Sequence, residues 1–197
     1  IEIRKFAYDF RAEHIPTFDD EIAALRKHKI ELTAWWFPTS LNSEARQILD
    51  VLKRNKVETQ LWVMGGGDSP LNPEQQQRRI ESEASRIRPI AEAAAEIGCT
   101  VALYNHGGWF GEPTNQLEII KRLKMTNVGI VYNLHHAHHQ IDQFPRLLEL
   151  MKPHLVALNL NGMIDNGDKI GKKIIPLGQG TRDLEILKAI RASGWRG

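Results

Sequence analysis

Six short apolar runs alternate with longer amphipathic segments along the chain. The runs are Ile3–Tyr8, Ile30–Phe37, Glu58–Met64, Thr100–Tyr104, Val128–Asn133 and Leu155–Leu160. They are rich in β-branched and aromatic residues, and several are apolar almost throughout, which is typical of strands buried on both faces of a parallel sheet. Their starts recur at about 27 or 28 residues, with one longer interval, which is the spacing of strand–helix–strand crossovers. The pattern therefore predicts an α/β protein with a parallel sheet.

The segments between these runs carry helix start and stop signals. Predicted N-caps are Thr17, Ser43 and Asn72, the last followed by proline, and their helices are expected to end near Lys27, Arg54 and Gly98. Further helices are predicted to begin near Thr114, Asp142 and Thr181. Each predicted strand is thus followed by a predicted helix or by a loop that leads to one.

This alternation favours a (β/α)8 TIM barrel over a doubly wound open sheet. The open sheet usually carries a G-x-G-x-x-G turn after an early strand, and the glycines at 65–67 lack that spacing. A TIM barrel typically needs about 250 residues, and this chain has 197. We therefore expect one domain over residues 1–197, a TIM barrel lacking its first βα unit and its last strand.

Composition excludes several classes of protein. The formal net charge is +2, and the densest basic cluster, Lys169–Lys173, is short and reads as a solvated loop, so nucleic acid is not an expected partner. No run approaches the length of a membrane span. The one cysteine, Cys99, allows no intrachain disulfide and fits a reducing compartment. We expect a cytoplasmic protein, and leave export open because the chain does not begin with Met. A homo-oligomer also stays open.

Candidate chemistry is concentrated where the predicted strands end, which is the active-site face of a TIM barrel. The sharpest cluster is His135, His136, His138 and His139, of which the first three are tentative metal ligands. Imidazole suits Zn, Mn or Fe, and it also carries protons near neutral pH. His135 and His106 are the predicted catalytic residues, with Glu13 as a further candidate, and strand periodicity predicts that Asn133 and His135 share a face.

Amide and aromatic side chains accompany these histidines. Amides donate and accept hydrogen bonds, which suits sugar hydroxyls, and flat aromatic rings suit sugar faces. Residues predicted to bind substrate are Trp36, Trp62, Tyr104, Asn105, Asn133, Asn159, Asn161 and Gln179. Core packing for the tryptophans and loop support for the amides are the competing interpretations.

The same residues resemble the sugar phosphate isomerase/epimerase family, the xylose isomerase-like TIM barrels. The stretches that carry the resemblance are ALYNHGGWFGEP, NVGIVYNLHHAHHQIDQFPRLLELMKPHLVALNLNG and IIPLGQGTRDLEILKAIRASGWRG. The resemblance implies a divalent metal (Zn, Mn, Fe or Mg) held by Glu, Asp, His and Glu at four strand ends. The first three of these positions correspond here to Tyr104, Asn133 and Asn159, and the fourth falls after Gly197.

The resemblance also implies the reaction. It predicts a sugar or sugar phosphate isomerase or epimerase that transfers a proton next to a carbonyl of a small carbohydrate, with or without metal assistance. Two alternatives remain: a lyase or hydrolase of an oxidised sugar, and a carbohydrate-binding protein with a degraded metal site. Neutral Tyr and Asn are poor substitutes for carboxylates around a hard cation.

Overall fold

The computed structural model describes residues 4–8 and 12–197, except for the side chains of Ala12, Glu13 and Ile15. The chain divides into two compact units. The first unit comprises Ile1–Met64, Leu71–Leu103 and Glu118–Gly129, and the second comprises Gly65–Pro70, Tyr104–Leu117 and Ile130–Gly197.

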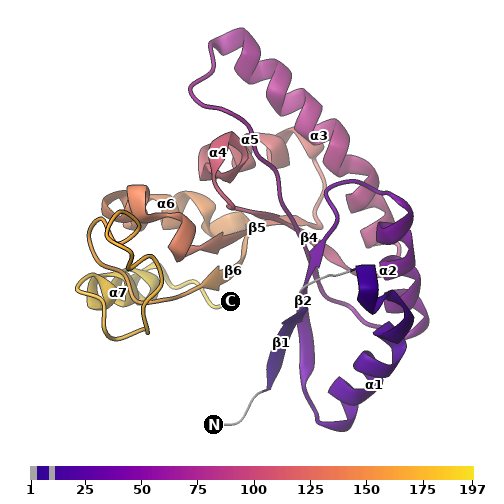
Figure 1. Ribbon diagram of the computed structural model, residues 1–197. Coiled ribbons are helices and arrows are strands. Elements are labelled where there is room, and N and C mark those ends of the chain that lie inside the picture. The colour runs from indigo at the N-terminus through magenta and orange to yellow at the C-terminus, as the bar shows by residue number, and fades with distance from the viewer. Residues whose placement is uncertain (1–3, 9–11) are drawn as a thin grey trace. The chain divides into compact units, whose positions relative to one another are not determined.

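Six strands form the sheet, and they follow one another in sequence order (Figure 1). They are β1 (Lys5–Tyr8), β2 (Glu31–Phe37), β3 (Gln60–Val63), β4 (Thr100–Tyr104), β5 (Val128–Asn133) and β6 (Leu155–Asn159). The pairs β1–β2, β2–β3 and β3–β4 in the first unit are parallel, and so is β5–β6 in the second. Every predicted strand is confirmed, with ends that differ by at most two residues within the described chain.

The helices also follow the sequence prediction. The α-helices are α1 (Phe18–Lys27), α2 (Ser43–Arg54), α3 (Pro73–Ala95), α4 (Gly108–Gly111), α5 (Pro113–Leu123), α6 (Phe144–Met151) and α7 (Asp183–Ser193). The 3-10 helices are η1 (Ala12–Thr17), η2 (Leu134–His136), η3 (His138–Gln143) and η4 (Lys152–His154). Among the described residues, no helix combines the length and the apolar character needed to cross a membrane.

Two of the three predicted caps need correction. Asn72 caps α3 as predicted, in a reciprocal capping box with Gln75. The cap of α2 is Asn42, whose side chain accepts from the amide of Ala45, and not Ser43. Thr17 precedes α1, but its hydroxyl makes no capping bond and contacts the His14 carbonyl and the Glu21 carboxylate instead.

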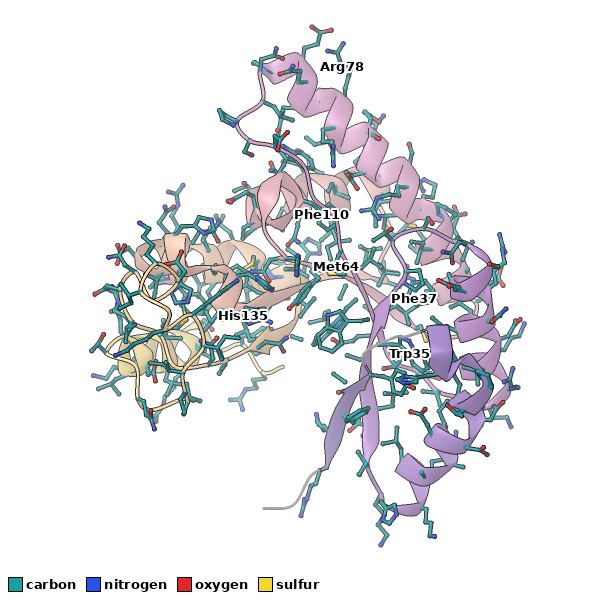
Figure 2. All side chains as sticks on the ribbon, in the orientation of Figure 1. Trp35, Phe37, Met64, Arg78, Phe110 and His135 are labelled. Atoms are coloured by element: carbon teal, nitrogen blue, oxygen red, sulfur yellow. The ribbon has the colours of Figure 1, made fainter. Side chains whose placement is uncertain are left out.

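The core of the first unit packs around an aromatic group on β1, β2 and α1. The rings of Trp35 and Phe18 lie edge to face with centroids 4.9 Å apart, and Tyr8 lies 4.5 Å from Trp35. Trp35 and Phe37, on alternate positions of β2, are both buried (Figure 2). Because β2 alternates, Trp36 points to the opposite face of the sheet, where it meets its register partner Trp62.

In the second unit, a glycine-rich segment packs closely against α4. The amide of Trp109 donates to the Gly67 carbonyl at 2.8 Å. A β-carbon on Gly65 would lie 2.4 Å from the Phe110 ring, so only glycine permits this approach. Phe110, labelled in Figure 2, is fully buried. Gly65 of the triple glycine therefore serves packing in this structure.

Gln116 on α5 gives a stability prediction. Its side chain is 0% exposed, and neither amide atom has a hydrogen-bond partner among the described residues. An unsatisfied buried polar group costs about 1–3 kcal/mol. We expect Gln116→Leu to raise the free energy of unfolding by about 1 kcal/mol in chemical denaturation, since leucine has a similar volume and no polar atoms. A loss of stability of that size would contradict this interpretation.

Candidate functional site

Three imidazoles gather in the second unit, just after the ends of β4 and β5. The ring centroids of His135 and His136 are 3.9 Å apart, and those of His136 and His106 are 4.6 Å apart. We call His106, His135 and His136 the imidazole cluster; His135 is labelled in Figure 2. The structure therefore brings together both predicted catalytic histidines, with His136 between them. The predicted shared strand face of Asn133 and His135 is wrong, because β5 ends at Asn133 and His135 lies in η2.

A buried hydrogen-bonded group lies next to this cluster. The side-chain amide of Asn105 donates to the Asn133 carbonyl at 3.1 Å, and its oxygen accepts from the Asn133 backbone amide at 2.7 Å. Asn133 Nδ2 donates in turn to the hydroxyl of Tyr104 at 2.8 Å. We call these three residues the Tyr–Asn network. Their exposed fractions are 3%, 2% and 5% for Tyr104, Asn105 and Asn133.

The Tyr–Asn network touches the imidazole cluster in two ways. The ring of Tyr104 lies edge to face with His136, with centroids 5.6 Å apart, and 6.0 Å from His106. Asn133 Oδ1 accepts from the backbone amide of His135 at 3.3 Å. These three residues were predicted to bind substrate, and that role stays a prediction; in the structure they are buried and bonded to one another.

Two histidines of the cluster, His135 and His136, have lowered pKa values that favour the neutral imidazole. Burial, followed by the positive charge of Lys173, lowers the pKa of His135. Burial and the neighbouring imidazoles lower the pKa of His136 to about 4. Burial also raises the pKa of the Tyr104 hydroxyl, so this group keeps its proton at neutral pH.

His138 and Asn161 belong to a different contact. Nε2 of His138 lies 2.8 Å from the Lys173 carbonyl, which makes it the donor. Nδ2 of Asn161 donates to the Gly162 carbonyl at 2.8 Å and reaches the same Lys173 carbonyl at 3.5 Å. Both side chains are buried and anchor the segment that follows β6. His138, predicted as a metal ligand with His135 and His136, is therefore engaged in loop packing.

Asp183, at the start of α7, fixes the other end of this segment. Its carboxylate is 4% exposed and accepts from the amides of Met163, Gly178 and Gly180 at 2.7, 2.6 and 2.9 Å. Gly178 and Gly180 flank Gln179, whose side chain is exposed. A β-carbon on Gly180 would lie 2.2 Å from the Asp183 carboxylate, so glycine is required there. Asp183 thus holds the turn that presents Gln179.

His139 lies outside the cluster. Its Nε2 is 3.1 Å from Glu112 Oε1, and Gln140 Nε2 donates to the other carboxylate oxygen at 2.5 Å. The hydroxyl of Tyr132 donates to Gln140 Oε1 at 2.9 Å. This chain of bonds joins η3 to α4 and β5, which agrees with a structural role for His139.

Trp36, Trp62 and Glu13 lie in the first unit. The rings of Trp36 and Trp62 meet edge to face with centroids 4.5 Å apart, and Trp62 Nε1 donates to Gln60 at 3.0 Å. Trp62 is buried and Trp36 is partly exposed, so Trp36 alone has much surface to offer a ligand. The side chain of Glu13 lies outside the described residues. The catalytic role of Glu13 and the substrate-binding roles of Trp36 and Trp62 stay predictions.

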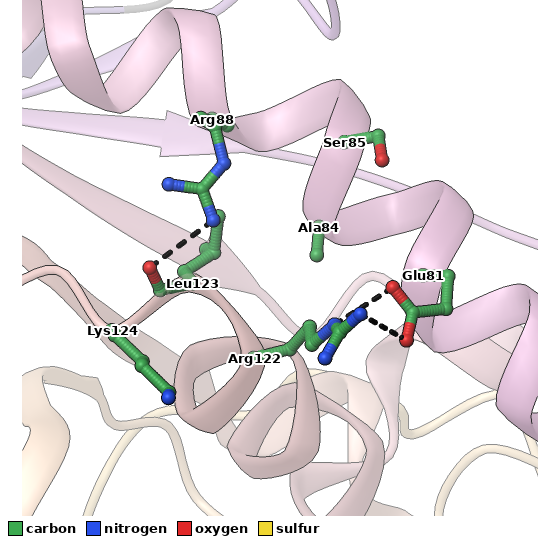
Figure 3. Close-up of a pocket in the computed structure, with 7 residues that line it drawn as sticks. All are labelled: Glu81, Ala84, Ser85, Arg88, Arg122, Leu123 and Lys124. Carbon is green, nitrogen blue, oxygen red and sulfur yellow. Dashed lines mark hydrogen bonds and ion pairs between the residues drawn. The ribbon is translucent and has the colours of Figure 1, made fainter.

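A pocket of about 480 Å³ also lies in the first unit, between α3 and the end of α5 (Figure 3). Arg122 pairs with the Glu81 carboxylate, and Arg88 donates to the Leu123 carbonyl at 3.2 Å. Further lining residues are Ala84, Ser85 and Lys124. Arg88 and Arg122 in the pocket wall are thus already bonded to protein acceptors. No residue predicted for the functional site lines this pocket.

The donors at the strand ends do not fit the divalent cation that the resemblance implies. Within the described part of the chain, no group of three or more His, Cys, Asp or Glu side chains could hold a metal ion. Tyr104 and Asn133 are uncharged, buried and bonded to each other, whereas hard cations favour carboxylate oxygens. Asn159, the register partner of Asn133, is also an uncharged amide. We therefore derive no chemical step through a metal.

Sequence analysis overlooked Lys173 and Asp183. Lys173 was placed in a solvated loop, and its side chain is exposed, but its charge acts on His135 and His136. Asp183 directly follows the GQGTR stretch and begins a helix, which is the only sequence signal for its role. The backbone groups that it binds are separated along the chain, so no local pattern could reveal them.

Comparison with known proteins agrees with this architecture. The family model for xylose isomerase-like TIM barrels matches residues 8–197. The structure of 3-keto-D-glucoside 4-epimerase YcjR from E. coli is similar, with 13% identity, a TM-score of 0.69 and coverage of 99% of this chain and 89% of that one. No curated protein matches this chain.

Two further solved structures have a similar fold. A D-tagatose 3-epimerase-like protein is 16% identical, with a TM-score of 0.70 and coverage of 98% of this chain and 79% of that one. The probable 3-DHS dehydratase AsbF from Bacillus anthracis is 17% identical, with a TM-score of 0.70 and coverage of 96% and 79%. At these identities the likeness establishes the fold and leaves the reaction open.

The environment of His136 predicts its titration. Because its pKa is lowered to about 4 in the folded protein, an NMR titration of the imidazole resonances should show it neutral at pH 6, where an unperturbed histidine is mostly charged. The sign follows from linkage: the unfolded state binds the proton first, so this contribution to stability is present above about pH 6.5 and is lost as the pH falls toward 4. Titration near pH 6.5 would contradict the proposed burial.

The contacts of Asp183 predict a stability loss. We expect Asp183→Asn to lower the free energy of unfolding by about 2 kcal/mol, because hydrogen bonds to a charged group are worth about 1.5–3 kcal/mol each and one amide group cannot accept all three. Asp165→Asn is the matched control, since the Asp165 side chain is 61% exposed and pairs only at the surface. Equal effects of the two substitutions would refute the role of Asp183.

Proposed function

Because the chain belongs to the xylose isomerase-like TIM barrel family, we propose that it is a sugar isomerase or epimerase that moves a proton on the carbon next to a carbonyl. The observation that carries the proposal is the imidazole cluster after β4 and β5, on the side of the strands where TIM barrels place their active sites. The sugar epimerases among the similar structures support the substrate class.

The chemistry needs a base for the carbon-bound proton and a donor for the carbonyl oxygen. We assign the base to His106 and the donor to His136, whose low pKa keeps it a neutral imidazole. A neutral imidazole can donate its N–H to a carbonyl as negative charge develops on the oxygen. With centroids 4.6 Å apart, the two rings can address adjacent atoms of one substrate.

Return of the proton from His106 to the adjacent carbon, on the face from which it was taken, gives isomerisation. Epimerisation needs a second proton donor on the opposite face of the same carbon, while His106 keeps the proton that it removed. His135 packs against His136 and limits its movement, so its part in the proposal is to orient the donor. Gln179, exposed on its turn, is assigned to a sugar hydroxyl.

A second function is favoured by one specific observation. The uncharged Tyr–Asn network at positions where the resemblance implies carboxylates fits a protein that binds carbohydrate without converting it. The two functions differ in whether solvent protons enter the sugar, and that exchange can be measured. A dehydration product would instead support the lyase alternative.

We expect wild-type protein to exchange solvent deuterium into the carbon next to the carbonyl of a suitable ketose, with D-fructose, D-tagatose and a 3-keto-glucoside as first probes, followed by NMR. His106→Ala should reduce the exchange rate about 10²- to 10⁴-fold, because that is the usual contribution of a general base. His154→Ala is the control, since His154 is an exposed residue of η4.

Two results would count against the proposal. Full exchange in His106→Ala would remove this histidine from the reaction. Binding of these sugars by the wild type, with no exchange in any of them, would favour the binding function.

A further inference from the structure

The ends of three neighbouring strands carry a row of uncharged side chains. Tyr104 ends β4, Asn133 ends β5 and Asn159 ends β6. Tyr104 and Asn133 are joined by a side-chain hydrogen bond of 2.8 Å, and Asn133 is paired in register with Asn159. These are the three positions at which the family resemblance implies Glu, Asp and His around a divalent cation.

The hydrogen bonds of Asn133 are made to other groups of the protein. Its Nδ2 donates to Tyr104, and its Oδ1 accepts from the His135 amide. Its backbone amide and carbonyl are both bonded to the side chain of Asn105. With an exposed fraction of 5%, Asn133 has its polar groups engaged before any ligand arrives.

This arrangement is unfavourable for a hard cation. Mn²⁺ and Mg²⁺ gain most of their affinity from carboxylate charge, and this row supplies none. Releasing the Asn133 amide to a cation would also break a buried hydrogen bond, and a neutral ligand would not repay that loss. The phenol of Tyr104 keeps its proton, because burial raises its pKa.

The Tyr–Asn network also contacts the imidazole cluster through one hydrogen bond and two ring contacts. The bond from the His135 amide to Asn133 Oδ1 begins η2, the 3-10 turn that carries His135 and His136. The ring of Tyr104 packs against both His106 and His136. The network is thus well placed to fix the orientation of all three rings.

We propose that the Tyr–Asn network takes the place of the divalent cation in this chain, as a neutral support that positions the imidazole cluster to bind the sugar without metal. Tyr104, Asn105 and Asn133 are positioning residues in this account. Only the identity of the ligand rests on the proposed function; the statement about the cation is independent of turnover.

The proposal is tested by asking whether carboxylates at positions 104 and 133 give the chain a metal site. Mn²⁺ affinity of the full chain is measured by electron paramagnetic resonance and calorimetry for the wild type and for Tyr104→Glu/Asn133→Asp. The matched control is Gln143→Glu/Asn166→Asp, which adds the same charge at two exposed positions. We expect no specific site in the wild type or the control, and binding at least about tenfold tighter in the first variant, because two adjacent carboxylates are restored.

Two outcomes would overturn the proposal. One is a stoichiometric Mn²⁺ site in the wild type that is lost in Asn133→Leu. The other is a folded Tyr104→Glu/Asn133→Asp variant that binds Mn²⁺ no better than the control. If circular dichroism shows that this variant does not fold, Asn133→Asp alone is measured against Asn166→Asp under the same criteria.

The positioning role has its own readout. Tyr104→Phe removes the hydroxyl that accepts from Asn133 and keeps the ring, so the imidazole resonances of His136 should shift while those of exposed His154 stay unchanged. Unchanged resonances of all histidines in a folded variant would refute the positioning role. Because neither readout uses turnover, failure of this inference is distinct from failure of the proposed function.

Discussion

The site depends on the side chain of Asn105, which closes the gap between the ends of β4 and β5 with two hydrogen bonds. This one amide both donates to and accepts from the backbone of Asn133, and so replaces a rung of the sheet ladder at the point where the strands end. The polypeptide can then leave both strands in new directions without exposing unpaired backbone groups. His106 follows Asn105 and η2 follows Asn133, so these hydrogen bonds determine where the imidazoles can lie.

The uncharged surroundings of the imidazole cluster follow from this hydrogen-bonded closure. The groups that contact the cluster include amides, a phenol and other imidazoles, and the cation Lys173 lowers the pKa of His135 and His136. Two carboxylates of the second unit are engaged elsewhere: Glu112 binds His139 and Gln140, and Asp183 binds backbone amides. The chain thus has the fold of its family, with uncharged Tyr104, Asn133 and Asn159 at three neighbouring strand ends.

The sequence predicted the fold well, because strands such as Val128–Asn133 are mostly apolar and buried on both faces. It also located the cluster, since His106 and His135 directly follow strand ends. The prediction of side-chain positions failed where the chain leaves the strand pattern and where side chains bond to residues distant in the sequence. Strand alternation cannot extend past Asn133 into a 3-10 turn, and the bond from His138 to the Lys173 carbonyl joins residues far apart in the chain. Such contacts depend on tertiary packing, which no local pattern encodes.

We propose that one sugar contacts His106 and His136, while His135 packs against His136. This contact is measured by titrating ¹⁵N-histidine-labelled protein with a ketose that it binds and following every imidazole by NMR. We expect the resonances of His106 and His136, and of neighbouring His135, to move with one dissociation constant, while those of His28, His139 and His154 stay in place. If the protein is saturated with the ketose and the cluster resonances do not move, the sugar binds elsewhere.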